Sequence, residues 1–495
     1  ALGGRRVELG VFARDLVCGD GRRRGFAQVA DDVEVGSGRL HHDEVRALLH
    51  AVLLLPWLAA AAPKPDIVFL LIDDLGFADC GFNGGKLIRT PNIDRLAKAG
   101  AVLEHHYVQP VCSPTRSTLL TGRYPTRTGV YSIVTPHAPW GLPLAERTLA
   151  QGLREAGYAT HIVGKWHLGE FEPAYLPLAR GFEHHYGHYF GAIDYFTHIR
   201  GKEVDWHRDG QPSKDEGYST YLLRDEACRV IANQPKDKPL FLYVPFNGVH
   251  SPYQAPEAAH KDYPDLKGSR QKFAGMLTAI DEAVGRIEEA LRQAGRLENT
   301  LIVFSSDNGG PGMSDNTPLR DHKGSIFEGG VRAAAFATWP GRIPGGQRIR
   351  EPMHMVDWYP TLLRLAGAST EQKLPIDGLD LWPMLTTKAA SPHDAILCVS
   401  TQGPERAAVR MGPWKLMQLN APARAIDEES GEGKAKGKAA KAAAKYEPLA
   451  LYNLEEDPGE TRNLATAQPE RVKAMQARLA ELLRGAVPPG KPGAK

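Results

Sequence analysis

Short apolar runs alternate with helix-like segments from residue 66 onward, and this alternation limits the folds open to the chain. Residues 67–72, 158–163, 239–246 and 301–306 are mostly apolar and often β-branched, which predicts buried strands. Helical patterns cover residues 91–100, 146–157 and 271–294, the first opening with Thr90 as N-cap and Pro91 at the first helical position. Such βα alternation predicts an α/β domain with a mainly parallel or mixed sheet covered by helices.

The pattern changes beyond about residue 395. Residues 407–419 resemble a hairpin, residues 452–464 a turn-rich segment, and residues 469–483 a closing helix. We therefore expect a main domain over residues 63–395 and a small C-terminal subdomain over 396–495. Residues 427–445 are rich in Gly, Ala, Lys and Glu, and we interpret them as a solvated insertion.

The N-terminal segment carries the pattern of a secretory signal peptide over residues 45–62. A basic residue, Arg46, precedes a short apolar run and then four small residues, Ala59 to Ala62. The run is too short for a membrane span. We expect export, to the periplasm or outside the cell, and expect residues 1–44 to be upstream sequence that the mature protein lacks.

Charge and cysteine spacing exclude some classes of protein. The net charge of this 495-residue chain is only +2, so we expect no nucleic-acid partner. The five cysteines show no CxxC or Cys/His spacing, which argues against structural zinc and a disulfide scaffold. His184, His185 and His188 also lack ligand spacing, and we interpret them as peripheral pocket wall or surface.

Pairs of residues with carboxylate or amide side chains follow two of the expected strands. Asp73 and Asp74 come directly after residues 67–72, and Asp307 and Asn308 follow residues 301–306. Sites in open α/β sheets lie at the carboxyl ends of strands. If these two strands are close, their oxygen ligands suit a hard divalent cation, Ca²⁺ or alternatively Mg²⁺, better than zinc.

Cys112 lies between these pairs in the sequence, beside an expected helix start near Ser113. Pro114 suits the first turn of that helix, and Arg116 would lie on the same face as Cys112. Backbone amides at a helix N-terminus favour an anion. Local sequence alone leaves two interpretations of Cys112 open, a reactive group and an inert buried thiol.

The segment Cys112-Ser113-Pro114-Thr115-Arg116 is followed by Leu120-Thr121-Gly122-Arg123. The two are similar to the Cys-x-Pro-Ser/Thr-Arg signature and trailing box of the type I sulfatase family, which the chain resembles over residues 65–464. Further boxes are similar at Gly164-Lys165-Trp166-His167-Leu168-Gly169, at residues 247–252 around His250, at Lys323 ahead of residues 327–332, and at residues 452–460. The resemblance implies an alkaline-phosphatase-like α/β fold, a large mixed sheet flanked by helices with a small C-terminal α+β subdomain.

The resemblance also implies the chemistry. Cys112 would be oxidised to formylglycine by a maturation enzyme, and its hydrate would share the metal with Asp73, Asp74, Asp307 and Asn308. Lys165 and Lys323 would hold the sulfate, and His250 or Lys323 would assist the leaving oxygen. The remaining roles would fall to His167 as the base of the second step, Asp307 in activating the nucleophile, and Arg116 in orienting the hydrate.

Three segments, at residues 191–198, 218–220 and 318–320, resemble the arylsulfatase B (N-acetylgalactosamine-4-sulfatase) branch of the family. A sulfated carbohydrate, or an aryl sulfate, is therefore the expected substrate. Two alternatives stay open: a phospho- or phosphonate-ester hydrolase of the same superfamily, and a non-catalytic binder of sulfated glycans if Cys112 is unmodified.

Overall fold

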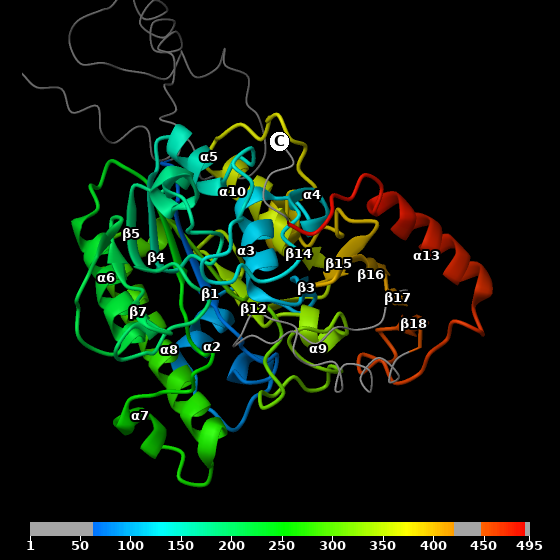
Figure 1. The fold of residues 1–495 in the computed structure, drawn as a ribbon, viewed down its shortest axis with the longest axis horizontal. Helices are drawn as coiled ribbons and strands as arrows, with labels where there is room; N and C mark the ends of the chain where they lie inside the picture. The colour runs from blue at the N-terminus through cyan, green and yellow to red at the C-terminus, as the bar shows by residue number, and fades with distance from the viewer. Residues whose placement is uncertain (1–62, 420–446, 491–495) are drawn as a thin grey trace, which may run out of the picture. The chain divides into compact units, whose positions relative to one another are not determined.

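A ten-stranded mixed sheet forms the centre of the unit spanning residues 64–495 (Figure 1). The computed structural model describes residues 63–419 and 447–490. The strand order is β13-β2-β12-β11-β1-β10-β4-β5-β8-β9, with β1 parallel to both β11 and β10. The strands are β1 Asp66–Ile72, β2 Ala101–Leu103, β4 Ala159–Lys165, β5 His184–His188, β8 His207–Arg208, β9 Gln211–Pro212, β10 Leu240–Pro245, β11 Thr300–Ser306, β12 Ala335–Thr338 and β13 Gln347–Ile349.

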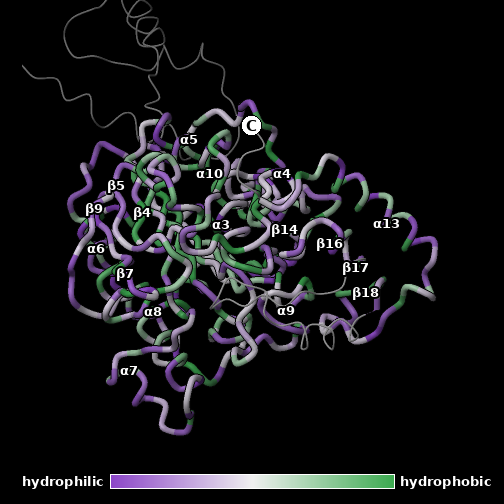
Figure 2. The backbone as a smooth tube through the Cα atoms, viewed as in Figure 1, coloured by the Kyte–Doolittle hydropathy of each residue, from purple (hydrophilic) through white to green (hydrophobic). Residues whose placement is uncertain are grey.

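Helices cover both faces of this sheet because alternate residues of β1 point to opposite sides. Val68, Leu70 and Ile72 pack with apolar residues of α2 (Pro91–Ala99), α6 (Ser219–Asn233) and α8 (Gly268–Gln293). Ile67, Phe69 and Leu71 pack with apolar residues of α3 (Cys112–Thr121), α5 (Leu149–Glu155) and α10 (Trp358–Leu365). Figure 2 shows hydrophobic residues along the central strands and hydrophilic residues around the outlying α7 (Glu257–Lys261).

The shorter elements connect and extend these layers. They are β3 His106–Tyr107 paired with β14 Met353–His354, β6 Ile199–Arg200 paired with β7 Glu203–Val204, the helices α4 Pro125–Thr128, α9 Glu328–Val331 and α11 Trp382–Thr387, and the 3-10 turns η1 Gly81–Asn83, η2 Pro173–Tyr175, η3 Pro177–Arg180, η4 Leu297–Asn299 and η5 Met355–Asp357. Among the described residues, none of the helices combines the length and apolarity needed to cross a membrane.

A four-stranded antiparallel sheet lies in the C-terminal part of the chain, beside α13 (Pro469–Leu482) in Figure 1. Its strands are β15 Ile396–Ser400, β16 Gly403–Met411, β17 Trp414–Leu419 and β18 Leu449–Asn453. One face packs against α13, and the other packs against Ile326, Phe327 and Val331. The C-terminal sheet therefore supports the segment that follows Lys323.

The α/β fold class expected from the sequence is confirmed, and the expected strands and helices form within a few residues of their predicted bounds. Thr90 holds the N-cap position of α2 but makes no capping bond; its hydroxyl accepts from the Gly81 N–H instead and donates to the Asp94 carboxylate. Residues 452–464 were expected to be turns, but Tyr452 and Asn453 end strand β18. The division into domains at residue 395 stays a prediction, and residues 1–62 and the insertion at 427–445 lie outside the described residues.

The histidine cluster was wrongly expected at the periphery or surface. His185 and His188 are fully buried on β5, and His184 is nearly so. Strand β5 pairs in parallel with β4, so its side chains enter the core on both faces.

A buried ionic cluster joins the C-terminal sheet to α9. The Lys415 ammonium on β17 lies 2.9 Å from both the Glu328 carboxylate and the Glu460 carboxylate. Glu460 also accepts a hydrogen bond from the Glu328 backbone N–H, at 2.7 Å. All three side chains are at most 1% exposed, so each charge depends on its partners rather than on water.

Replacing Lys415 by Met should therefore lower the free energy of unfolding by about 3–5 kcal/mol, because two buried carboxylates lose the cation that they share. Urea or guanidinium unfolding measures this change. Lys473→Met on the exposed side of α13 is the control and should change stability little. Equal stability of both variants would contradict this account of the cluster.

Candidate active site

The Asp73–Asp74 and Asp307–Asn308 pairs meet at the carboxyl ends of β1 and β11, because these two strands are neighbours in the sheet. Ile72 and Ser306 are partners in the parallel register, and the Asp307 N–H donates to the Ile72 carbonyl at 3.0 Å. Asp74 has φ 68°, and its N–H donates to Asp307 Oδ1 at 3.3 Å. Asn308 Nδ2 donates to Asp74 Oδ1 at 2.8 Å. These four buried side chains therefore form one group of oxygen-bearing ligands.

Arg116, on α3, links the ends of β1 and β11. Its Nη2 donates to Asp307 Oδ2 at 2.8 Å and to Asp73 Oδ2 at 3.3 Å, and its Nη1 donates to the Lys165 carbonyl at 3.1 Å. Burial opposes ionisation of Asp73, but the charges of Lys165, His250 and Arg116 outweigh it and hold the pKa of Asp73 well below its usual range. Burial and the charge of Asp73 raise the pKa of Asp307 to about 6.

Cys112 occupies the first position of α3, within one residue of the expected start. Its Sγ lies 3.3 Å from Asp73 Oδ1, and the side chain is buried. Burial, followed by the charges of Asp307 and Asp73, raises the pKa of the Cys112 thiol. A thiolate is the nucleophilic form of cysteine, so these surroundings do not activate the unmodified side chain.

The two predicted sulfate-binding lysines lie at the acidic group. The Lys165 ammonium at the end of β4 contacts the Asp73 carboxylate. Lys323 Nζ lies 2.9 Å from Asp74 Oδ1 and 3.0 Å from Asp74 Oδ2. His250 Nε2 lies 3.7 Å from Asp74 Oδ2. All ten site residues predicted from the sequence are thus gathered here, once His167 is added.

His167 reaches the site by a route that the sequence pattern did not indicate. On an extended strand, residues 165 and 167 would face the same side. Instead β4 ends at Lys165, and His167 adopts φ 58°. Burial, with the charges of Lys165 and Arg116, lowers the pKa of His167 well below its ordinary value. The imidazole is therefore held in its neutral form at neutral pH.

A cavity of about 590 Å³ opens at Cys112. Four predicted site residues line its inner part, Cys112, His167, His250 and Lys323. The outer wall is formed by two chain segments and a hairpin, at residues 133–137, 190–192 and 200–203. None of the outer residues carries an acid–base role predicted from the sequence, although residues 191 and 192 fall in the segment used for the branch resemblance.

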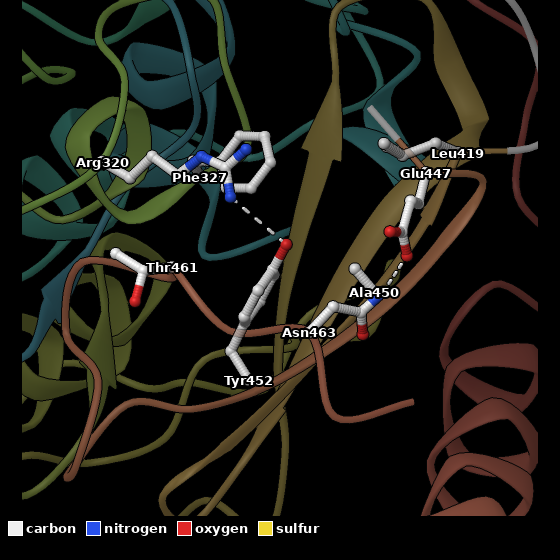
Figure 3. A pocket seen from close by; sticks show the side chains of 8 residues that line it. All are labelled: Arg320, Phe327, Leu419, Glu447, Ala450, Tyr452, Thr461 and Asn463. Atoms are coloured by element: carbon white, nitrogen blue, oxygen red, sulfur yellow. Dashed lines mark hydrogen bonds between the residues drawn. The ribbon is translucent and has the colours of Figure 1, made fainter. Parts of the chain in front are cut away.

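A second cavity, of about 210 Å³, lies between the segment before Lys323 and the C-terminal sheet (Figure 3). Arg320 stacks over the Phe327 ring at 4.1 Å, and its Nη1 donates to the Glu460 carbonyl at 2.5 Å and to the Tyr452 hydroxyl at 3.4 Å. None of the predicted site residues lines this cavity. Arg320 therefore anchors the Lys323 segment, and the chemistry belongs to the larger cavity.

The ligand group suits a divalent cation. Asp73, Asp74, Cys112 and His250 each offer one ligand atom, and these atoms lie within 4.8 Å of one another. Asn308 Oδ1 is buried, and it has no hydrogen-bond partner within the described residues. Amide and carboxylate oxygens are the ligands that hard divalent cations prefer, so an unpartnered buried oxygen beside carboxylates suits such an ion. The structure thus fits the expected metal, and it adds His250 to the neighbouring side chains.

A pocket that combines buried carboxylates, two lysines and histidines around one cysteine is suited to an anionic ester substrate, and comparison with known proteins identifies the class. The family model described as "Sulfatase" matches residues 65–368, so the chain belongs to the sulfatase family and is a sulfuric ester hydrolase.

Individual relatives agree with this assignment. The chain is 35% identical to arylsulfatase J of Mus musculus over 465 residues, covering 87% of this chain and 77% of the relative. It is 36% identical to N-acetylgalactosamine-6-sulfatase of Mus musculus over 369 residues, covering 68% and 69%. The solved structure of Ps i-CgsB in complex with k-i-k-neocarrahexaose is similar with a TM-score of 0.77 at 32% identity, covering 86% and 94%.

Gly191 is a site residue that the sequence reasoning did not single out for chemistry. A Cβ built at Gly191 would lie 2.5 Å from His167 Nε2 and 2.6 Å from its Cε1. Any side chain at this position must therefore displace the imidazole. The only sequence signal was the place of Gly191 in a segment used for the branch resemblance.

Gly191→Ala should lower kcat by roughly 10- to 100-fold, since a shift of about 1 Å in a reacting group can have that effect. Steady-state assays on an aryl sulfate, together with thermal unfolding, separate this from loss of fold. Gly312→Ala is the control, because its Cβ would meet only His322 Cδ2 at 3.8 Å. If Gly191→Ala keeps normal kcat, His167 does not need its observed position.

Proposed function

We propose that this sulfatase hydrolyses sulfate esters of a carbohydrate through a formylglycine made from Cys112. The observation that carries the proposal is the position of Cys112, at the inner end of a large cavity and 3.3 Å from Asp73, with Lys323, His167 and His250 lining the same cavity. These side chains are among those to which the proposal assigns roles.

The proposed reaction has two steps on the hydrated aldehyde. One of its two hydroxyls attacks sulfur while the S–O bond to the alcohol breaks, which leaves a sulfated hydrate and a free alcohol. The second hydroxyl then loses its proton, and its electrons form the aldehyde C=O as sulfate leaves. Addition of water regenerates the hydrate. No water molecule attacks sulfur in this sequence.

The surrounding side chains have separate roles in this proposed reaction. Lys165 and Lys323 hold the sulfate oxygens, and His250 or Lys323 gives a proton to the leaving alcohol oxygen. Asp307 takes the proton of the attacking hydroxyl. His167 takes the proton in the second step, for which a neutral imidazole is suited. Arg116 orients the hydrate through its contacts at the base of the site.

A divalent cation belongs to the same proposal. Asp73, Asp74, Asp307 and Asn308 would hold it, and it would add positive charge next to the sulfate oxygens. We propose Ca²⁺, with Mg²⁺ as the alternative, because the group is dominated by carboxylate and amide oxygens.

The names of the relatives support a sulfated carbohydrate as substrate. One relative is an N-acetylgalactosamine-6-sulfatase, and Ps i-CgsB was solved in complex with k-i-k-neocarrahexaose. The finer assignment to the arylsulfatase B branch remains our prediction; the relatives described above carry other names. Export to the periplasm or the outside of the cell likewise remains a proposal, resting on the composition of residues 45–62, which lie outside the described residues.

Cys112→Ala should abolish hydrolysis of an aryl sulfate and leave the thermal unfolding transition near that of the wild type. Without the side chain no hydrate can form, while the helix start is retained. Cys228→Ala is the matched control, because Cys228 is half-buried on α6, where its Sγ contacts the Arg286 carbonyl. Mass spectrometry of the peptide that contains residue 112 should give the formylglycine mass in wild-type protein from its native host.

An intact thiol in active protein would refute the formylglycine route. Aryl phosphate serves as the second substrate in the same assay. Faster turnover of phosphate than of sulfate would favour the phosphoesterase alternative, and binding of sulfated glycans with no turnover would favour a non-catalytic binder.

Removal of the metal should abolish activity, and calcium should restore it more fully than magnesium. Metal analysis by mass spectrometry should find about one calcium per chain, and Asp307→Ala should lower that occupancy. Asp237→Ala, on an exposed turn, is the control and should keep the metal. Full activity after chelation, with no bound metal, would contradict the proposal.

A further inference from the structure

The outer part of the active-site cavity is bounded by a small separate hairpin. Strands β6 and β7 pair with each other and form their own two-stranded sheet. Gly201, with φ 64°, and Lys202 connect them as a two-residue turn. Residues 200–203 line the same cavity as Cys112.

The base of this hairpin is held in place. The Asp205 carboxylate accepts hydrogen bonds from the Tyr189 N–H at 3.0 Å and the Phe190 N–H at 2.6 Å. The Asp205 N–H donates to the His198 carbonyl at 2.9 Å, and the His198 ring stacks on Trp206 at 4.4 Å. The hairpin is therefore a fixed part of the cavity wall.

The hairpin contributes two cationic residues to the cavity lining, Arg200 at the end of β6 and Lys202 in the turn. Arg200 is half-exposed and Lys202 is exposed. Among the described residues, Lys202 takes part in no ion pair. Glu203 is the single carboxylate in the described lining of this cavity, and it lies 3.4 Å from His137 Nε2 on the facing segment. The Lys202 charge is thus available to a ligand.

Arg200 and Lys202 belong to the outer part of the cavity lining, apart from Lys323 and Lys165, which contact Asp74 and Asp73 at the inner end. The cavity volume of about 590 Å³ falls in the range of roughly 300–1,000 Å³ that encloses drug-sized ligands, which is far more than one sulfate needs. A substrate that places its sulfate ester at Cys112 therefore extends outward past the hairpin.

We propose that Arg200 and Lys202 form a second anion subsite, which binds a sulfate or carboxylate on the part of the substrate next to the ester that is cleaved. The substrate is then a carbohydrate that carries at least two anionic groups. This inference rests on the proposed sulfatase reaction and adds a specificity determinant that lies apart from the reacting groups.

The test uses the double variant Arg200→Gln/Lys202→Gln, each single variant, and Lys236→Gln as control. Lys236 is an exposed lysine outside the cavity. Hydrolysis of 4-nitrophenyl sulfate reports the reaction itself, and inhibition of that hydrolysis reports binding of three competitors. These are a monosulfated N-acetylhexosamine, a chondroitin-sulfate oligosaccharide with a neighbouring carboxylate, and a carrageenan oligosaccharide with a second sulfate.

The double variant should weaken inhibition by at least one of the two oligosaccharides by about tenfold or more, because charge-assisted hydrogen bonds are lost. Its kcat and KM for 4-nitrophenyl sulfate, and inhibition by the monosulfated sugar, should stay within about twofold of wild type. Which oligosaccharide responds identifies the second group as carboxylate or sulfate. Lys236→Gln should change none of these values.

Two outcomes would overturn the subsite. One is that the wild type hydrolyses 4-nitrophenyl sulfate, but each of the three competitors inhibits the double variant as strongly as it inhibits the wild type. The other is an equal loss for every anion, which would show general attraction rather than a site. Absence of aryl sulfate hydrolysis in the wild type would instead refute the proposed function.

Discussion

The contact of the Arg116 guanidinium with Asp73 and Asp307 is the constraint on which the rest of the site depends. Two parallel neighbouring strands end in carboxylates, which repel each other in a buried environment. The guanidinium from α3 offsets this repulsion, so the register of β1 and β11 and the position of α3 are fixed together. Cys112 begins the same helix, and its place follows from that contact.

Much of the fold could be predicted because the central strands carry unbroken apolar runs. Residues 67–72 and 301–306 are buried on both faces, and their composition indicates this directly. The two-residue strands of the β6–β7 hairpin are too short to produce a periodic pattern, and the last two residues of β18 fell within the segment expected to be turn-rich. The histidines of β5 were misplaced because burial of a polar strand depends on its neighbours in the sheet rather than on its own sequence.

The residues of the site could be named from their motifs, but their contacts could not. Spacing along an extended chain does not reveal that His167 takes a left-handed conformation, nor that Gly191 is excluded from having a side chain by the imidazole. The pairing of Lys165 with Asp73 and of Lys323 with Asp74 joins segments that are 92 and 249 residues apart. Such pairs arise from the tertiary fold, where burial makes each charge depend on a partner.

The β6–β7 hairpin has a further consequence for how such an enzyme can change. It shares no ladder with the ten-stranded sheet that carries the reacting groups at its strand ends. Insertions, deletions or charge changes in its turn can therefore accumulate without disturbing the register of β1 and β11. Enzymes that share this scaffold can therefore diverge in the substrates that they prefer, while the residues that break the ester bond stay the same.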